Sequence, residues 1–140
     1  MQTTVRLGLH TGRLTRAAAL EDYFRLGIGP DADFQLRAHP LFRNGQFGST
    51  PLASEFKLGN LTVGQDLLNS RYLHLGVVGF CDIAQLPRIY PGQRLSKSPL
   101  DAGVGLEFGI LGSLGPRFTL TYGHDFREHR RAIYLAASLR

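Results

Sequence analysis

Residues 101–110, DAGVGLEFGI, alternate without a fault between two kinds of side chain. One set is apolar and runs from Ala102 to Ile110, and the other consists of three glycines with Asp101 and Glu107. A period of two residues is that of a β-strand whose two faces meet different surroundings. The stretch therefore predicts a strand of about ten residues with an apolar face and a face of charges and glycines.

Five other stretches show the same period less completely: residues 3–10, 54–66, 72–83, 117–123 and 132–139. In the second of these the apolar parity changes between Leu58 and Leu61, which predicts a bulge near Gly59 and Asn60. The sequence thus predicts six strands, antiparallel because their connections are short, with short turns at one end and long loops at the other.

Strand length and loop asymmetry favour a barrel in a membrane. About ten residues is the length that a tilted strand needs to cross a bilayer, and short turns on one rim with long loops on the other are typical of outer-membrane barrels. We therefore predict an all-β fold, an antiparallel transmembrane β-barrel segment of about six strands with short periplasmic turns and long extracellular loops. A soluble β-sandwich binding module is the alternative, although its solvated face would favour Thr, Lys, Glu and Ser over glycine.

Composition sets the outer limits. The 140 residues fit one domain, 1–140, and a hydrophobic content of 43% excludes a disordered chain. The net charge of +5 comes from scattered arginines without an aromatic platform, so we expect no nucleic-acid partner. The single cysteine, Cys81, excludes an internal disulfide framework. The start of the chain has no signal peptide, and since an outer-membrane barrel must be exported, we expect a C-terminal piece of a longer protein with further barrel strands upstream.

A long inserted loop, about residues 14–52, separates the first two predicted strands and is marked by turn residues such as Gly27, Pro30 and Gly45. Loops of this length in compact proteins are usually functional or disordered. This one carries apolar residues that predict packing against another surface: Phe24, Phe34, Leu36, Leu41, Phe42 and Phe47.

One pair of charges organises these elements. Arg37 lies in the loop, and Asp82 lies on the polar face of the strand 72–83. If that face lines a barrel, both charges need partners, so we predict that Arg37 enters the barrel and contacts Asp82. Glu107 either joins this contact or faces water in the lumen, and we favour water. The plainer alternatives are an exposed loop arginine at 37 and an aspartate at 82 that only ends a strand.

Four segments now resemble the C-terminal barrel of the BamA/TamA (bacterial surface antigen) family. Residues 24–29 (FRLGIG) followed by 36–39 (LRAH) resemble the lead and tip of that family's sixth extracellular loop, and 80–84 (FCDIA) its Phe-x-Asp-x-Gly strand motif. Residues 103–108 and 115–122 are similar to its next two strands. The resemblance implies that the loop arginine, Arg37, contacts the strand aspartate, Asp82, with Gly27 and Gly29 as loop-motif residues and Phe80 as a strand-motif residue.

The sequence departs from the family pattern at three places. Ala38 and His39 replace the glycine and the aromatic residue of the loop tip, Ala84 replaces the glycine of the strand motif, and the chain ends without a terminal aromatic residue.

The resemblance implies a place in the bacterial outer membrane and a role in outer-membrane protein assembly or polypeptide translocation. Its partners would be outer-membrane lipid and lipopolysaccharide, and unfolded outer-membrane or secreted polypeptides. Six basic residues in the long loops suit lipid phosphates: Arg88, Arg94, Lys97, Arg127, Arg130 and Arg131. The alternative is the membrane-anchoring barrel of a larger exported protein with an upstream enzyme domain.

We expect no catalytic residue, no cofactor and no metal in this segment. The five histidines show no metal-ligand spacing, and the sequence places no acidic partner beside them: His10, His39, His74, His124 and His129.

Overall fold

The computed structural model describes residues 2–15, 19, 22–28, 33–40, 42–43, 46–47, 50–110 and 115–138. This part of the chain is all-β, as predicted, and contains ten strands: β1 (Thr3–Arg13), β2 (Phe24–Ile28), β3 (Phe34–Pro40), β4 (Phe42–Arg43), β5 (Gln46–Phe47), β6 (Leu52–Asn69), β7 (Leu73–Ile89), β8 (Leu100–Ile110), β9 (Arg117–Asp125) and β10 (Arg131–Ser138). The described residues contain no helix that is long and apolar enough to cross a membrane.

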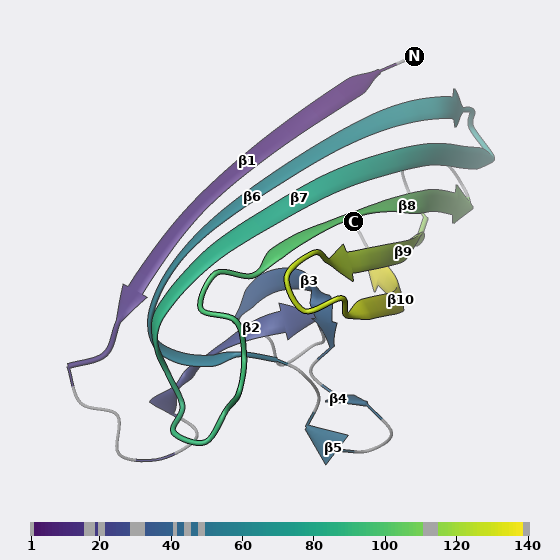
Figure 1. Cartoon of the computed structure of the whole chain (residues 1–140). Helices are drawn as coiled ribbons and strands as arrows, with labels where there is room; N and C mark the ends of the chain where they lie inside the picture. Colours follow the sequence, from purple (N-terminus) through teal and green to yellow (C-terminus); the bar gives the residue numbers. More distant parts are fainter. Residues whose placement is uncertain are drawn as a thin grey trace.

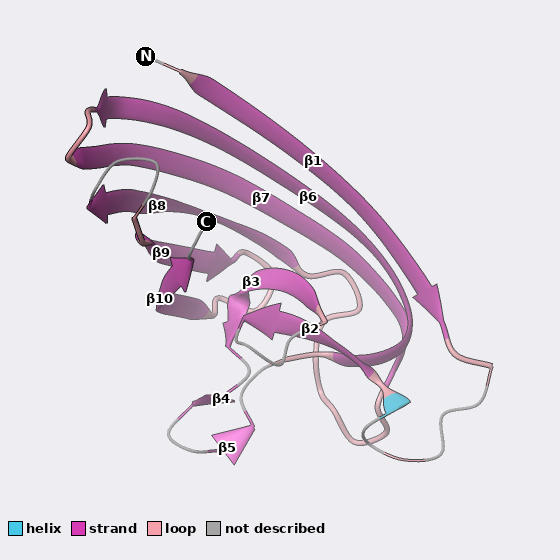
Figure 2. Cartoon of the chain, turned by 180° about the vertical axis from the view of Figure 1, so that it is seen from behind, coloured by secondary structure: helices cyan, strands magenta, loops and turns pink. Residues whose placement is uncertain are grey.

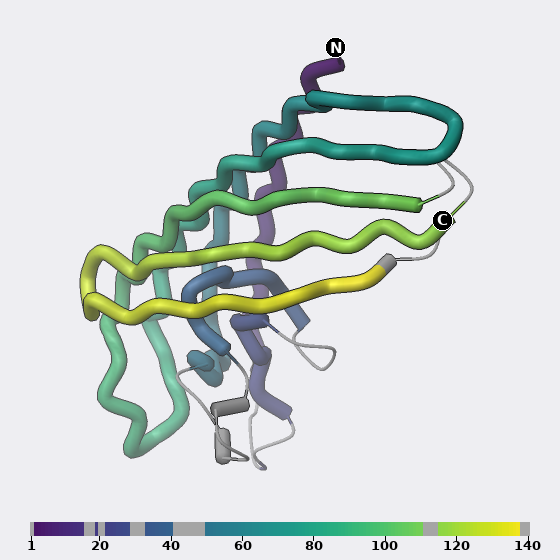
Figure 3. Tube along the Cα trace, turned by 90° about the vertical axis from the view of Figure 1, so that its right-hand side faces the viewer, coloured from purple at the N-terminus to yellow at the C-terminus, as the bar shows by residue number. Residues whose placement is uncertain are grey.

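Six long strands form one strongly curved wall in the order β1-β6-β7-β8-β9-β10, each antiparallel to its neighbour (Figure 1). These are the six predicted strands, and the prediction of an antiparallel, barrel-shaped sheet is confirmed. Within the described residues β1 and β10 do not pair with each other, so each is an edge of the wall. Figure 3 shows the turn between β6 and β7 at one end, and the loops that follow β7 and β9 at the other end.

The predicted loop 14–52 is not structureless, because it contains β2 to β5. The first residues of β2 pair with the start of β6, Phe24 opposite Ala53 and Arg25 opposite Leu52. The segment then turns inward, where β3 runs parallel to β2 and contacts β7, β8, β9 and β10 on the inner side of the wall (Figures 1 and 2). The predicted packing holds for Phe24, Phe34 and Leu36, whereas the side chains of Leu41, Phe42 and Phe47 lie outside the described part.

The hydrophobic core lies between this inserted segment and one end of the wall. It consists of Leu26, Leu36, Ala53, Phe56, Leu58, Ala84 and Leu86, with Phe24, Phe34 and Ile89 packed against it. This core explains why β7 continues to Ile89 through residues predicted as loop: Ala84 and Leu86 point inward and cover the inserted segment.

The predicted bulge near Gly59 and Asn60 is wrong. The pairing of β6 with β7 is regular from Leu58 to Asp66, and its irregularities lie between residues 53 and 57 and near residue 67. Residues 56 and 58 point inward with Asn60, whereas Leu61 points outward. The apolar parity along β6 changes because the groups that its inner face contacts change: the apolar inserted segment near Phe56 and Leu58, and polar groups from Asn60 onward.

The outer face of the wall is apolar and exposed. Leu9 is 78% exposed and Ile133 is 72% exposed, and the same holds at lower values for residues of every wall strand, among them Val63, Leu75, Val104 and Leu120. A β-sandwich would bury such a face against a second sheet. The alternative of a soluble sandwich therefore does not fit this single curved sheet.

Candidate functional site

The structure brings Arg37 and Asp82 together inside the curved wall. Arg37 comes from β3 and Asp82 from β7, and they are 7% and 0% exposed. The guanidinium donates from Nε to Asp82 Oδ2 at 2.8 Å and from Nη2 to Oδ1 at 2.6 Å, and the Arg37 backbone N–H donates to Oδ2 at 3.1 Å. Two parallel hydrogen bonds between ionised groups form the strongest class of side-chain contact.

Neighbouring side chains complete this contact. Arg37 Nη1 donates to Thr62 Oγ1 at 2.9 Å, and the guanidinium carbon lies 4.0 Å from the centre of the Phe80 ring, a cation–π distance. Asn60 Nδ2 donates to Asp82 Oδ1 at 2.8 Å and to the Gln35 carbonyl at 2.9 Å. Asn60 and Thr62 were missed by sequence reasoning, although each lies opposite a predicted site residue: Asn60 is paired with Asp82 and Thr62 with Phe80.

Asp82 is the first of three aspartates in a row across the wall. Asp82 on β7 is paired with Asp101 on β8, and Asp101 with Asp125 on β9. All three are fully buried. Residues 37–39 of β3 face this row, so that this part of the loop tip meets the wall through charged and polar groups.

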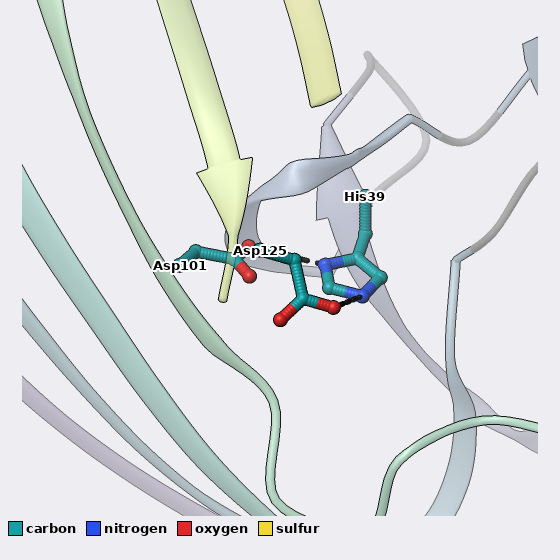
Figure 4. Close-up of side chains that lie close together, drawn as sticks. All are labelled: His39, Asp101 and Asp125. Atoms are coloured by element: carbon teal, nitrogen blue, oxygen red, sulfur yellow. Dashed lines mark hydrogen bonds and ion pairs between the residues drawn. The ribbon is translucent and has the colours of Figure 1, made fainter. Parts of the chain in front are cut away.

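The next two residues of β3 contact the other two aspartates. The Ala38 backbone N–H donates to Asp101 Oδ2 at 2.6 Å. His39 Nδ1 lies 3.1 Å from the same oxygen, and His39 Nε2 lies 3.5 Å from Asp125 Oδ2 (Figure 4). The expectation that no histidine has an acidic partner was wrong, because the wall register brings two distant aspartates to the loop tip.

Glycines permit two close approaches, one between the loop and the wall at Gly123 and one within the inserted loop at Gly27. A Cβ added to Gly123 would overlap the Arg37 carbonyl oxygen, and one added to Gly27 would lie 2.6 Å from the His39 carbonyl oxygen. The loop-motif residue Gly27 is therefore buried at the back of the tip. Gly29, the other predicted loop-motif glycine, lies outside the described residues.

Among the described residues Glu107 forms no hydrogen bond or ion pair with the inserted segment, so it does not join the contact of Arg37 with Asp82. It lies six residues beyond Asp101 on β8, with Oε2 4.0 Å from His74 Nε2. There it lines a polar cavity of about 260 Å³ together with Arg6, Asp66 and Arg117. The preference for a water-facing Glu107 is consistent with this polar lining.

The six basic residues predicted in the long loops differ in whether they have an acidic partner, and two of them lie in strands, Arg88 in β7 and Arg131 in β10. Arg88 lies 3.5 Å from Glu55, and Arg130 lies 2.6 Å from Glu128. The other four are exposed: Arg94, Lys97, Arg127 and Arg131. Ser96 lies in the loop after β7 and Glu128 in the loop after β9. The Ser96 backbone N–H donates to the Glu128 carboxylate, which shows that the two loops lie side by side.

In comparisons with known proteins, no family model, no curated protein and no solved structure matches the chain. The site is accordingly interpreted from its own geometry, which joins an inserted segment to the inside of a curved wall through a row of buried carboxylates.

Proposed function

We propose that the chain is a segment of a BamA/TamA-like outer-membrane β-barrel that acts in outer-membrane protein assembly or polypeptide translocation, without a catalytic role of its own. The observation that carries this proposal is the reversal of polarity across the wall. Charged groups such as Arg37 and Asp82 are buried inside, while Leu9, Val104 and Ile133 are exposed outside. Water disfavours that arrangement and a bilayer favours it.

The docked loop tip supports the family part of the proposal. The resemblance implied an arginine–aspartate contact between loop and strand, and Arg37 meets Asp82 with the geometry described above. In a closed barrel, an inserted segment that is held by charges on the inner side would fill part of the lumen at one end. Such a segment is suited to a barrel that handles polypeptides and must remain sealed while it does so.

The two unpaired edges support a larger assembly. Among the described residues β1 and β10 each bond to one neighbour, and open edges with unsatisfied backbone groups are not stable in lipid. Further strands, from a longer polypeptide or from another copy of the chain, are needed to close the barrel. A free edge is also a template to which an incoming strand can add.

The test uses the bacterium that carries the gene. The chromosomal copy is replaced by one with Arg37→Ala, and a second strain receives Arg94→Ala as a matched control in an exposed loop. We expect the protein in the outer-membrane fraction of both strains, with reduced amounts of other folded outer-membrane barrels only in the Arg37→Ala strain. Recovery in the soluble fraction would overturn the membrane assignment, and normal barrel assembly in a deletion strain would overturn the assembly role.

A further inference from the structure

Beside His39, the carboxylates of Asp101 and Asp125 carry negative charge that the contacts described so far do not balance. All three side chains are buried, at 1%, 0% and 0% exposure. Arg37, the cation nearest in the sequence of β3, is engaged with Asp82 and Thr62. Two neighbouring carboxylates in a dry site repel each other, and either a cation or a proton must offset that repulsion.

Two carboxylate oxygens at this site have no hydrogen-bond donor within the described part of the chain. They are Asp101 Oδ1 and Asp125 Oδ2, and both are inaccessible to solvent. An ionised oxygen that is buried without a partner is strongly unfavourable, because it has lost its hydration and gained no donor in return. Asp125 Oδ2 is the oxygen that faces His39 Nε2 (Figure 4).

The two contacts of the imidazole differ in kind. The distance of 3.1 Å from Nδ1 to Asp101 Oδ2 is that of a hydrogen bond, in which Nδ1–H donates. The 3.5 Å from Nε2 to Asp125 Oδ2 is too long for one. Two ligands that each lie about 2.0–2.1 Å from a tetrahedral zinc ion are separated by roughly 3.3 Å. Nε2 and Asp125 Oδ2 are therefore spaced as two ligands of one ion, and each residue of the group offers a ligand atom within 4.8 Å of the others.

We propose that His39 and Asp125 bind a divalent transition-metal ion of the zinc class, and that Asp101 is a positioning residue that holds the His39 ring. A carboxylate that accepts from Nδ1–H fixes the tautomer and leaves the Nε2 lone pair free for the metal. One imidazole with carboxylate oxygens suits zinc-class ions rather than Mg²⁺ or Ca²⁺, which prefer oxygen ligands alone. The ion joins β3 to β9 and fixes the loop tip at the end of the row remote from Arg37. This inference rests on the three side chains and not on the proposed function.

The test measures zinc binding by the whole protein in detergent after chelation and dialysis. ZnCl₂ alone is titrated by calorimetry, and the bound metal is counted by mass spectrometry. We expect one ion per chain in the wild type and an increase in the unfolding temperature when zinc is added. His39→Ala should abolish this binding, and the isosteric Asp125→Asn should weaken it at least 100-fold. Asp101→Asn still accepts from Nδ1–H and should weaken it about tenfold, within the range for outer-sphere partners of a metal site.

His10→Ala is the matched control, because His10 is an exposed histidine on β1, and it should bind zinc as the wild type does. The absence of stoichiometric zinc in the wild type would overturn the proposal. So would Asp125→Asn with wild-type affinity, since that variant keeps the size of the side chain and tests the ligand even if His39→Ala does not fold.

Discussion

The backbone of Arg37 lies against the Cα of Gly123, so closely that a Cβ on residue 123 would overlap the Arg37 carbonyl oxygen. Gly123 belongs to β9 and Arg37 to β3, and the strands come from opposite halves of the chain. The contact shows that the loop tip touches the wall with its main chain as well as with its side chains. Any side chain at 123 must move either the loop or the strand.

Gly123→Ala should therefore destabilise the docked loop, by about 1–3 kcal/mol, as overpacking of a close contact usually does. The control is Gly79→Ala, because a Cβ at residue 79 meets nothing within 4 Å. Urea unfolding of the protein in lipid vesicles measures the stability, and the rate of trypsin cleavage between residues 14 and 52 measures docking. Equal behaviour of the two variants would show that the loop does not approach Gly123.

The outer face gives a prediction that separates lipid from water. Leu106 is half exposed on the apolar outer face of β8, so Leu106→Arg would be nearly neutral in a soluble protein. In a bilayer the same change should cost about 2–4 kcal/mol near the midplane. Gln85→Arg is the control, an exposed polar position near the loop end of β7. The free energy of unfolding in vesicles is measured for both variants. A Leu106→Arg variant as stable as the wild type would contradict lipid exposure of this face.

The exposed loop cations predict binding to anionic headgroups. Replacing the four residues Arg94, Lys97, Arg127 and Arg131 by Gln should lower the affinity for vesicles that contain lipopolysaccharide or anionic phospholipid, and salt should weaken the wild-type binding because exposed charges are screened. Arg71→Gln, in the turn between β6 and β7 at the other end of the wall, should have no effect. Co-sedimentation that is independent of salt would argue against an electrostatic contact.

The wall could be predicted from sequence because each strand keeps a period of two residues over most of its length. The contact of Arg37 with Asp82 could be predicted as well, since two charges that face a barrel interior each need a partner, and a family resemblance pointed to the same two residues. The first inference depends on a local pattern of residues and the second on one pair of charges, and both can be read from the sequence without knowing the strand register.

The partners of His39 could not be predicted in the same way. Asp101 and Asp125 lie 62 and 86 residues away in the chain, and only the register of β8 with β9 places them level with each other. A shift of one residue would turn either aspartate to the outer face. The three aspartates on successive strands were a signal that only the strand register could interpret: Asp82 lies within β7, Asp101 near the start of β8 and Asp125 at the end of β9.

The misplaced bulge in β6 has a related cause. The change of apolar parity between Leu58 and Leu61 was attributed to the strand, whereas it reflects what lies inside the barrel at each level. When a strand faces an apolar insert along half its length and polar groups along the rest, its inward-facing residues are apolar in the first half and polar in the second. The sequence pattern then changes although the strand has no bulge. Sequence periodicity cannot distinguish these cases unless the insert is already placed.

The central claim is that Arg37 and Asp82 hold the inserted loop inside the barrel, and a double-mutant cycle tests it most directly. The free energy of unfolding in vesicles, with protease sensitivity of the loop, is measured for Arg37→Ala, Asp82→Ala and the double variant, and Glu107→Gln serves as a control outside the contact. Each single change leaves a buried charge without its partner and should cost about 3–5 kcal/mol. The double variant should lose less than the sum of the two, with a coupling energy of roughly 0.5–3 kcal/mol. Strict additivity would mean that the two residues do not touch in the folded protein, and would contradict the docked loop.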